Sequence, residues 1–276
     1  MSALTFTLKI ELKQRLDVSP LTPDRLHGVA PEAMAALPLA YGNRTLTTAE
    51  AFLIEGDDTD DIMFRNGSAK LDFLGRGMSR GRISVCGDAG SYLAMQMTGG
   101  DIVVEGRVDA YAACEMKNGA VSILGDAGDF LGAALPGNKK GMAGGVVLVK
   151  GNAGDRVGDH QRRGLILIEG NAGAYLGSRM TAGTILVLGQ VGDHCGYAMG
   201  RGSVLLAQAP ARISPTFSDC GVHTLGFIPL LIKSIAHMDT PIASMSDTLK
   251  RVHRYAGDLC SLGKGEILIA DVVSKR

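Results

Sequence analysis

The chain has 276 residues, 46% of them hydrophobic, and its 28 basic and 28 acidic side chains give a formal net charge of zero. This length can bury a sizeable core with appended segments, and the balanced charge excludes wholesale nucleic-acid binding. No run of about eighteen apolar residues occurs, and the amino terminus has neither a basic leader nor a long apolar core. We therefore expect a cytoplasmic protein that contacts neither nucleic acid nor membrane.

Signatures of catalysis, disulfides and metal sites are missing from the sequence. The five cysteines show no Cys-x-x-Cys spacing and the six histidines no His-Glu-x-x-His spacing, so we expect no disulfide, zinc or iron–sulfur site. No Walker lysine motif and no reactive cysteine with a recognisable partner base occurs. We predict no catalytic residue and no bound metal in this chain.

The first part of the chain reads as a cap. Thr5 to Leu12 alternates as a strand does, and Pro23 and Pro31 stand where short helices begin. Turn signals at Leu37-Pro38 and Gly42-Asn43 follow. We assign residues 1–48 to an amino-terminal cap.

The next stretch, Ala51 to Phe64, is acidic and resembles an imperfect first coil of the repeat described below. Its four aspartates could form a metal site or a solvated turn, and the lack of calcium-loop spacing favours the turn. They are Asp57, Asp58, Asp60 and Asp61.

A repeat of nineteen residues follows. A glycine opens the apolar run of each copy, and one step of 26 residues contains an insertion; these glycines are Gly81, Gly100, Gly119, Gly145, Gly164, Gly183 and Gly202. Such a period with one β-branched run per copy is typical of a solenoid whose coils bury apolar surface only by stacking. We predict an all-β solenoid of about seven coils over residues 49–209.

Two apolar columns support stacking of strands. The residues two places after each glycine are Ile83, Ile102, Val121, Val147, Ile166, Ile185 and Val204, and those two further on are also aliphatic. Because the two columns are two residues apart, both lie on one face of a strand. The same spacing excludes helical repeats. The glycines are expected at tight corners with positive φ rather than at a phosphate site.

The other half of each coil repeats a small residue and, three places later, a methionine. The second column reads Met78, Met97, Met116, Met142, Gln161, Met180 and Met199. Soft-metal ligation is one interpretation, but the period alone explains a packed bend, so we expect core methionines.

Three surface features go beyond a plain solenoid. The outward strand position carries Leu148, Leu167, Leu186 and Leu205 in consecutive coils, a stripe that must be covered by the carboxy-terminal segment or by a partner. The fourth coil contains an insertion with Lys139 and Lys140, which we predict to be a contact loop. A basic edge precedes the strands and consists of Arg80, Lys117, Arg162, Arg163 and Arg201.

The repeat stops near Pro210, and the composition changes. Phe227 to Ile232 is apolar and needs a cover, Ser246 to Tyr255 reads as a helix, and Glu266 to Ile269 as a strand. We assign 210–276 to a segment that covers the open end or flank of the stack.

The repeated Gly-x-x-Gly-x-x-x-Gly pattern, as in Gly170-x-x-Gly173-x-x-x-Gly177, and the tail Tyr255-Ala256-Gly257-Asp258 with Gly263-x-Gly265-x-Ile267 resemble the C subunit of formylmethanofuran dehydrogenases. The resemblance spans most of the chain, including Leu39-x-x-Gly42-Asn43. It extends to the carboxy-terminal domain of the large glutamate synthase subunit and implies a right-handed parallel β-helix with small α/β end segments.

The resemblance implies a scaffold within an enzyme complex, with the chemistry on other subunits. In methanogens such a complex reduces carbon dioxide onto methanofuran. In methylotrophic bacteria a formyltransferase/hydrolase complex moves a formyl group from tetrahydromethanopterin to a methanofuran-type carrier and releases formate. The alanine-, glycine- and arginine-rich composition is not that of a hyperthermophile and favours the bacterial setting.

The implied partners are amidohydrolase-like, formyltransferase and molybdopterin-enzyme-like subunits, which would hold the metal and the carrier. Because methanofuran-type carriers have a glutamate tail, the basic edge is a candidate site for that tail; solvated charges or salt bridges to a partner are the alternative. A freestanding glutamate synthase-type domain in amide-nitrogen transfer, and a plain oligomeric scaffold, also remain open.

Overall fold

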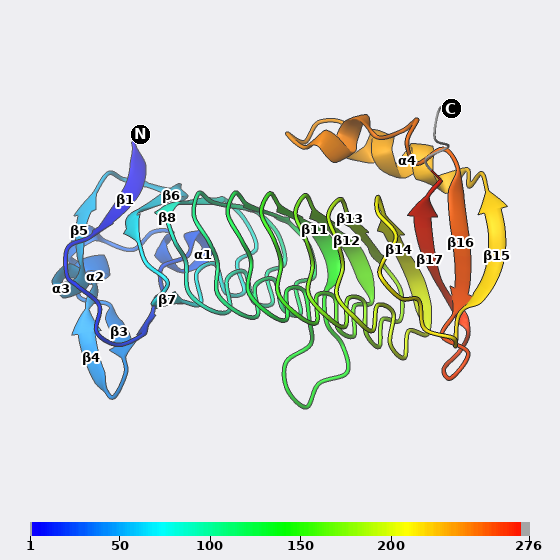
Figure 1. Cartoon of the computed structure of the whole chain (residues 1–276). Helices are drawn as coiled ribbons and strands as arrows, with labels where there is room; N and C mark the ends of the chain where they lie inside the picture. Colours follow the sequence, from blue (N-terminus) through cyan, green and yellow to red (C-terminus); the bar gives the residue numbers. More distant parts are fainter. Residues whose placement is uncertain (1, 272–276) are drawn as a thin grey trace.

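The computed structural model describes residues 2–271 as strands with few helices. Most strands belong to one mixed 13-stranded sheet, and four short strands form a second sheet. The repeats are stacked along one axis, with the amino-terminal segment at one end of the stack and the carboxy-terminal segment at the other (Figure 1). Residue 1 of the predicted cap and residues 272–276 of the predicted carboxy-terminal segment lie outside the described residues.

The amino-terminal end combines both sheets with three short helices. Strand β1 (Ala3–Leu8) pairs antiparallel with β5 (Phe52–Glu55) and parallel with β6 (Asp58–Gly67). The remaining elements are β2 (Leu16–Asp17), α1 (Pro23–Leu26), α2 (Pro31–Ala35), β3 (Pro38–Tyr41), β4 (Arg44–Thr47), α3 (Thr48–Ala51) and β7 (Leu71–Asp72). The helix starts predicted at Pro23 and Pro31 are confirmed, since proline suits the first turn.

The acidic stretch joins the stack only in part. Strand β6 pairs in parallel with β8 (Arg82–Gly87), as a coil strand does, whereas β5 turns back along β1. The interpretation of the whole stretch as a first coil is therefore wrong for its first half. The Asp60 carboxylate lies 3.6 Å from Arg80.

The repeat strands pair in parallel and in register. The central aliphatic residues align directly from Ile83 in β8 to Val204 in β14, and both predicted inward columns are buried. On the side of the coils opposite these strands, isolated parallel β-bridges join each coil to the next, from Ala89 to Val191. The strands after β8 are β9 (Asp101–Val104), β10 (Ala120–Ile123), β11 (Ala143–Val149), β12 (Arg163–Ile168), β13 (Thr184–Val187) and β14 (Arg201–Leu206).

Glycine and methionine have the structural roles that the period predicts. The seven glycines that open the strands all have positive φ, from 76° at Gly81 to 105° at Gly202, a conformation that costs glycine little. The six methionines of the column are fully buried. In the fifth coil Gln161 replaces methionine and donates from Nε2 to the carbonyl oxygens of Arg163, at 3.2 Å, and Gly164, at 3.1 Å.

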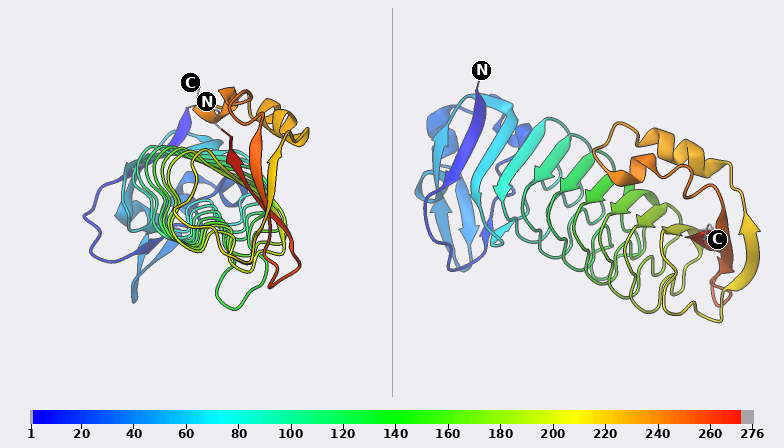
Figure 2. Two further views of the ribbon diagram at one scale, coloured as in Figure 1. Left: turned by 45° about the vertical axis from the view of Figure 1, so that its right-hand side comes forward. Right: turned by 45° about the horizontal axis from the view of Figure 1, so that its top comes forward.

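The carboxy-terminal segment both extends the sheet and covers its outer face. Strand β17 (Lys264–Ala270) pairs in parallel with β14, and β16 (Val252–Gly257) and β15 (Ser218–His223) follow it antiparallel. Between β15 and β16, α4 (Phe227–Ser234) and the 3-10 turn Pro241–Ser244 return over the stack (Figure 2).

One secondary-structure prediction in this segment is wrong. The sequence predicts a helix over Ser246 to Tyr255, but residues 246–251 form turns and bends and the last four residues belong to β16. Val252 is fully buried and opposes Ala270, and Tyr255 opposes Ile267. Pairing between two strands therefore outweighs the local helix-start signal, because β-branched and aromatic residues pack well on a sheet.

Candidate functional site

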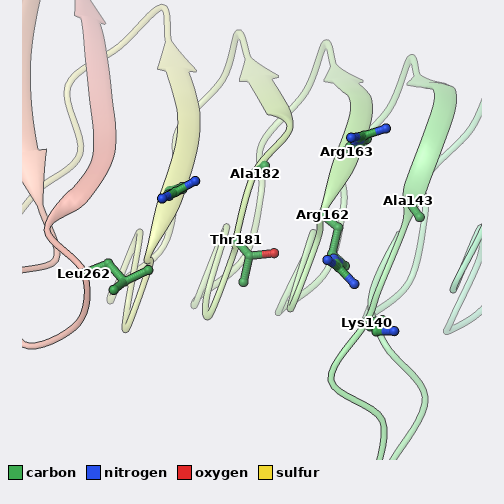
Figure 3. A pocket seen from close by; sticks show the side chains of 8 residues that line it. Lys140, Ala143, Arg162, Arg163, Thr181, Ala182 and Leu262 are labelled. Atoms are coloured by element: carbon green, nitrogen blue, oxygen red, sulfur yellow. The ribbon is translucent and has the colours of Figure 1, made fainter.

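A cavity of about 590 Å³ lies along the basic edge of the coils (Figure 3). Its residues come from the insertion, from the starts of consecutive coil strands and from the loop between β16 and β17. They are Lys140, Ala143, Arg162, Arg163, Thr181, Ala182, Arg201 and Leu262. Three of the five predicted basic-edge residues thus lie together with one lysine of the predicted contact loop.

The repeat itself sets the spacing of the arginines. Arg163 begins β12 and Arg201 begins β14, two coils further on, so their backbones are about 10 Å apart at strand spacing. Small residues of the intervening coil, Thr181 and Ala182, line the cavity between them. In the next strand Lys264 aligns with Arg201, which extends the row of cations by one position.

The cavity has a strongly positive lining. Four of its residues are cationic and none is acidic. Within residues 2–271, no carboxylate lies within 4.0 Å of Lys140, Arg162, Arg163 or Arg201. Such a concentration of one sign of charge in a concave surface attracts anions, and guanidinium groups bind carboxylates and phosphates through paired N–H donors.

The other predicted basic residues lie elsewhere. Arg80 is three coils away and its guanidinium lies 3.6 Å from Asp60, and Lys117 does not line the cavity. Lys139 lines a smaller hollow on the loop together with Glu115 and Lys140. The sequence period could not place Lys140 or Leu262, because both lie in irregular loops outside the repeat.

The insertion is fixed to the coils by Glu115. Its Oε1 accepts hydrogen bonds from Asn138 Nδ2 at 2.6 Å and from the Leu135 backbone at 3.2 Å, and Oε2 accepts one from Gln96 at 2.9 Å. Burial by itself raises the pKa of Glu115, but these hydrogen bonds and Lys117 outweigh it and hold the pKa below the ordinary value. The loop that supplies Lys140 is therefore anchored.

The leucine stripe lies under the carboxy-terminal segment. Leu148, Leu167, Leu186 and Leu205 are at most 3% exposed. They share one apolar cluster with residues of the returning segment, namely Ile228, Ile232, Ile235, Ile242 and Leu249. Figure 2 shows this segment over strands β11 to β14. In this chain the segment itself covers the stripe, one of the two covers considered from the sequence.

The described part of the chain shows no group placed to hold a metal ion, and two of its thiols are too deeply buried to react readily. Residues 2–271 contain no group of three or more His, Cys, Asp or Glu side chains placed to hold a metal ion. Burial raises the pKa of Cys114 and of Cys195 to about 12, which disfavours the thiolate. None of the helices described is long and apolar enough to cross a bilayer.

Comparison with known proteins identifies close relatives, although no protein-family model matches the chain. The chain is 41% identical to the C subunit of the formyltransferase/hydrolase complex Fhc of Methylorubrum extorquens. The alignment spans 266 residues, which are 96% of this chain and 98% of the relative. The C subunit of the tungsten-containing formylmethanofuran dehydrogenase 2 of Methanococcus maripaludis is 29% identical over 95 residues, 34% of this chain and 35% of the relative.

A solved structure agrees with this similarity. A chain in the crystal structure of the formyltransferase/hydrolase complex FhcABCD of Methylorubrum extorquens, determined with methylofuran, matches with a TM-score of 0.91 at 39% identity. The match covers 96% of this chain and 98% of that chain.

Proposed function

Because the chain belongs to the family of C subunits of formyltransferase/hydrolase complexes, we propose that it is the structural, non-catalytic C subunit of such a complex. The complex would transfer a formyl group from tetrahydromethanopterin to a methanofuran-type carrier and release formate. The observation that supports this most is the TM-score of 0.91 over 96% of the chain to a chain of FhcABCD.

The partners of this chain would be the other subunits of the complex. We propose that they are amidohydrolase-like, formyltransferase and molybdopterin-enzyme-like chains, and that they hold the metal and the reactive end of the carrier. In this arrangement the stacked coils provide a long rigid edge, and the anchored insertion provides a contact loop. Localisation in the cytoplasm is part of the same proposal.

The basic cavity is the part of this chain that suits an anionic chain. Its four cations have no carboxylate partner within the described residues, and they are spread over three coils. A row with this spacing can contact several carboxylates of an extended polyanion at once. We therefore propose that the cavity holds the acidic tail of the carrier; salt bridges to a partner subunit are the alternative.

The test replaces Arg162, Arg163 and Arg201 together by glutamine in the intact complex. Arg80→Gln is the matched control, since Arg80 lies on the same edge outside the cavity. The measurement is the amount of carrier retained per complex at increasing salt. We expect the triple variant to lose carrier at lower salt than the wild type and the control. Unchanged retention with an unchanged set of subunits would refute the tail site; loss of another chain from the complex instead would favour the salt-bridge alternative.

We also propose the finer architecture. The parallel strands of β8 to β14 and the second line of bridges from Ala89 to Val191 support a parallel β-helix. Its right-handed winding is proposed from the resemblance described above. The division into residues 1–48, 49–209 and 210–276 is proposed on the same basis. Parallel pairing runs from β6 to β17, whereas antiparallel pairing joins β1 with β5 near one end and β15, β16 and β17 near the other.

A further inference from the structure

A second cavity, of about 350 Å³, lies between the insertion and the third to sixth coils. It shares no residue with the basic cavity. The loop contributes Ala134, Leu135, Pro136, Gly137 and Asn138, and the coils contribute Tyr111, Phe130, Arg156, Asp159, His160 and Arg179. One side is therefore mainly apolar, and the other combines aromatic rings with cationic groups.

The aromatic rings belong to a stack along the outside of the coils. Phe73, Tyr92, Tyr111 and Phe130 occupy one position of the first four coils, with ring centroids 4.9, 5.3 and 4.6 Å apart. The last pair is nearly parallel, with 1° between the ring planes. In the fifth coil the same position is Arg156, so the first stack ends at Phe130, and both of its last two rings line the cavity.

Arg156 begins a second stack. Its guanidinium carbon lies 4.5 Å from the centroid of Tyr175, and Tyr175 stacks on His194 with centroids 4.7 Å apart. Within residues 2–271 no carboxylate lies within 4.0 Å of Arg156. A guanidinium that packs on an aromatic face still directs its N–H groups outward in its own plane, where they can bind an anion.

The negative charge of Asp159, the one carboxylate among the residues that line the cavity, is already neutralised by neighbouring donors. Asp159 is 4% exposed and accepts hydrogen bonds from Ser178 Oγ at 2.6 Å and from Arg179 Nε at 2.9 Å and Nη2 at 2.5 Å. His160 Nδ1 lies 3.3 Å away. Arg179 retains further N–H groups that Asp159 does not use. The cavity therefore presents unused donors and a net excess of positive charge.

The roof of the cavity is held in place without a ligand. The insertion is bonded to the fifth coil at both ends, from Ala134 N to the Asp159 carbonyl oxygen at 3.1 Å and from Gly141 N to the His160 carbonyl oxygen at 3.0 Å. Between these ends, Glu115 accepts hydrogen bonds from Leu135 and Asn138. A site formed in advance loses less conformational entropy on binding.

We propose that this cavity binds a small planar aromatic carboxylate. Its ring would lie against Phe130 and the apolar loop, and its carboxylate would pair with Arg156 and the unused N–H groups of Arg179. The volume suits a ligand of one or two rings, since small-molecule sites begin at about 300 Å³. This site is independent of the proposed role of the basic cavity.

The test uses 2-naphthoate as the probe and isothermal titration of the purified intact complex. We expect one saturable site per chain whose affinity falls about tenfold or more in Arg156→Gln, the effect of losing a hydrogen bond to a charged group. Phe130→Leu should weaken binding severalfold through lost stacking. Because other subunits can also bind the probe, only binding that depends on Arg156 is assigned to this cavity.

The matched control is Arg76→Gln. Arg76 lies 5.3 Å from the ring centroid of Phe73 at the other end of the same stack, outside the cavity, so this variant should bind 2-naphthoate as the wild type does. The neutral 2-naphthamide should bind at least about tenfold more weakly than 2-naphthoate. The proposal is overturned if no binding depends on Arg156, if Arg76→Gln weakens binding equally, or if the amide binds as well as the acid.

Discussion

Replacing Leu186 by alanine tests how the carboxy-terminal segment is held. Leu186 is 1% exposed, aligns with Leu167 and Leu205 in the neighbouring strands, and shares the apolar cluster of the returning segment. The returning helix α4 has only two buried residues, Ile228 and Ile232. Ile235, Ile242 and Leu249 of the same segment are buried in this cluster as well, so Leu186 packs against a continuous apolar surface of the segment.

The expected cost is that of a buried leucine turned into a cavity. Leu→Ala substitutions in cores cost about 2–5 kcal/mol, and a loss of about 3 kcal/mol corresponds to a shift of roughly a hundredfold in an opening equilibrium. Because the stripe lies between the sheet and the segment, we expect this loss to favour release of the segment. Amide hydrogen exchange of residues 227–249 in the intact complex measures it.

The control is Leu53→Ala. Leu53 is 52% exposed, so this substitution should change stability by less than about 0.5 kcal/mol and leave exchange in residues 227–249 unchanged. If Leu186→Ala left exchange of this segment as slow as in the wild type, the reasoning that the stripe holds the segment would be refuted.

Two further predictions follow from the pKa shifts. Because hydrogen bonds hold the pKa of Glu115 below its unfolded value of 4.5, the carboxylate stabilises the insertion above that pH, and this contribution is lost as the pH falls through the lower folded pKa. Amide exchange of residues 134–141, corrected for intrinsic rates, should rise over that range in the wild type but not in Glu115→Gln; equal pH profiles would contradict the anchor. Iodoacetamide at about pH 8, close to the ordinary thiol pKa, should modify the exposed Cys220 and Cys260. It should spare Cys114 and Cys195, because burial raises the pKa of both thiols to about 12. Labelling of Cys195 in the native complex would contradict its burial.

The stacked coils are predictable from the sequence because each coil repeats the same requirements. Strand-opening glycines need positive φ, and the aliphatic columns of Ile83 and Val85 must face inward in every coil. Because the period is fixed, these requirements also determine how neighbouring strands align, since a shift of one residue would expose a whole aliphatic column to solvent. The ends of the stack lack this redundancy, which is why the sequence predicts a helix where β16 forms.

The candidate site is predictable only where it follows the period. Arg162, Arg163 and Arg201 can be grouped because strand spacing fixes their separation. Lys140 and Leu262 depend on the paths of two irregular loops, and the path of the first depends on Glu115, a residue with no sequence signal of its own. The second cavity escapes sequence reasoning for the same reason, although the column from Phe73 to Phe130 and its interruption by Arg156 are visible in the sequence.

The central claim is that this chain is a structural subunit of a formyl-transferring and formyl-hydrolysing complex. Its most direct test is mild affinity purification of the native protein, identification of the chains that co-purify, and an assay of the eluate for formate release from formyl-tetrahydromethanopterin. The account predicts recovery of amidohydrolase-like and formyltransferase chains together with that activity. Recovery of the chain alone, or with glutaminase and flavin partners, would contradict it.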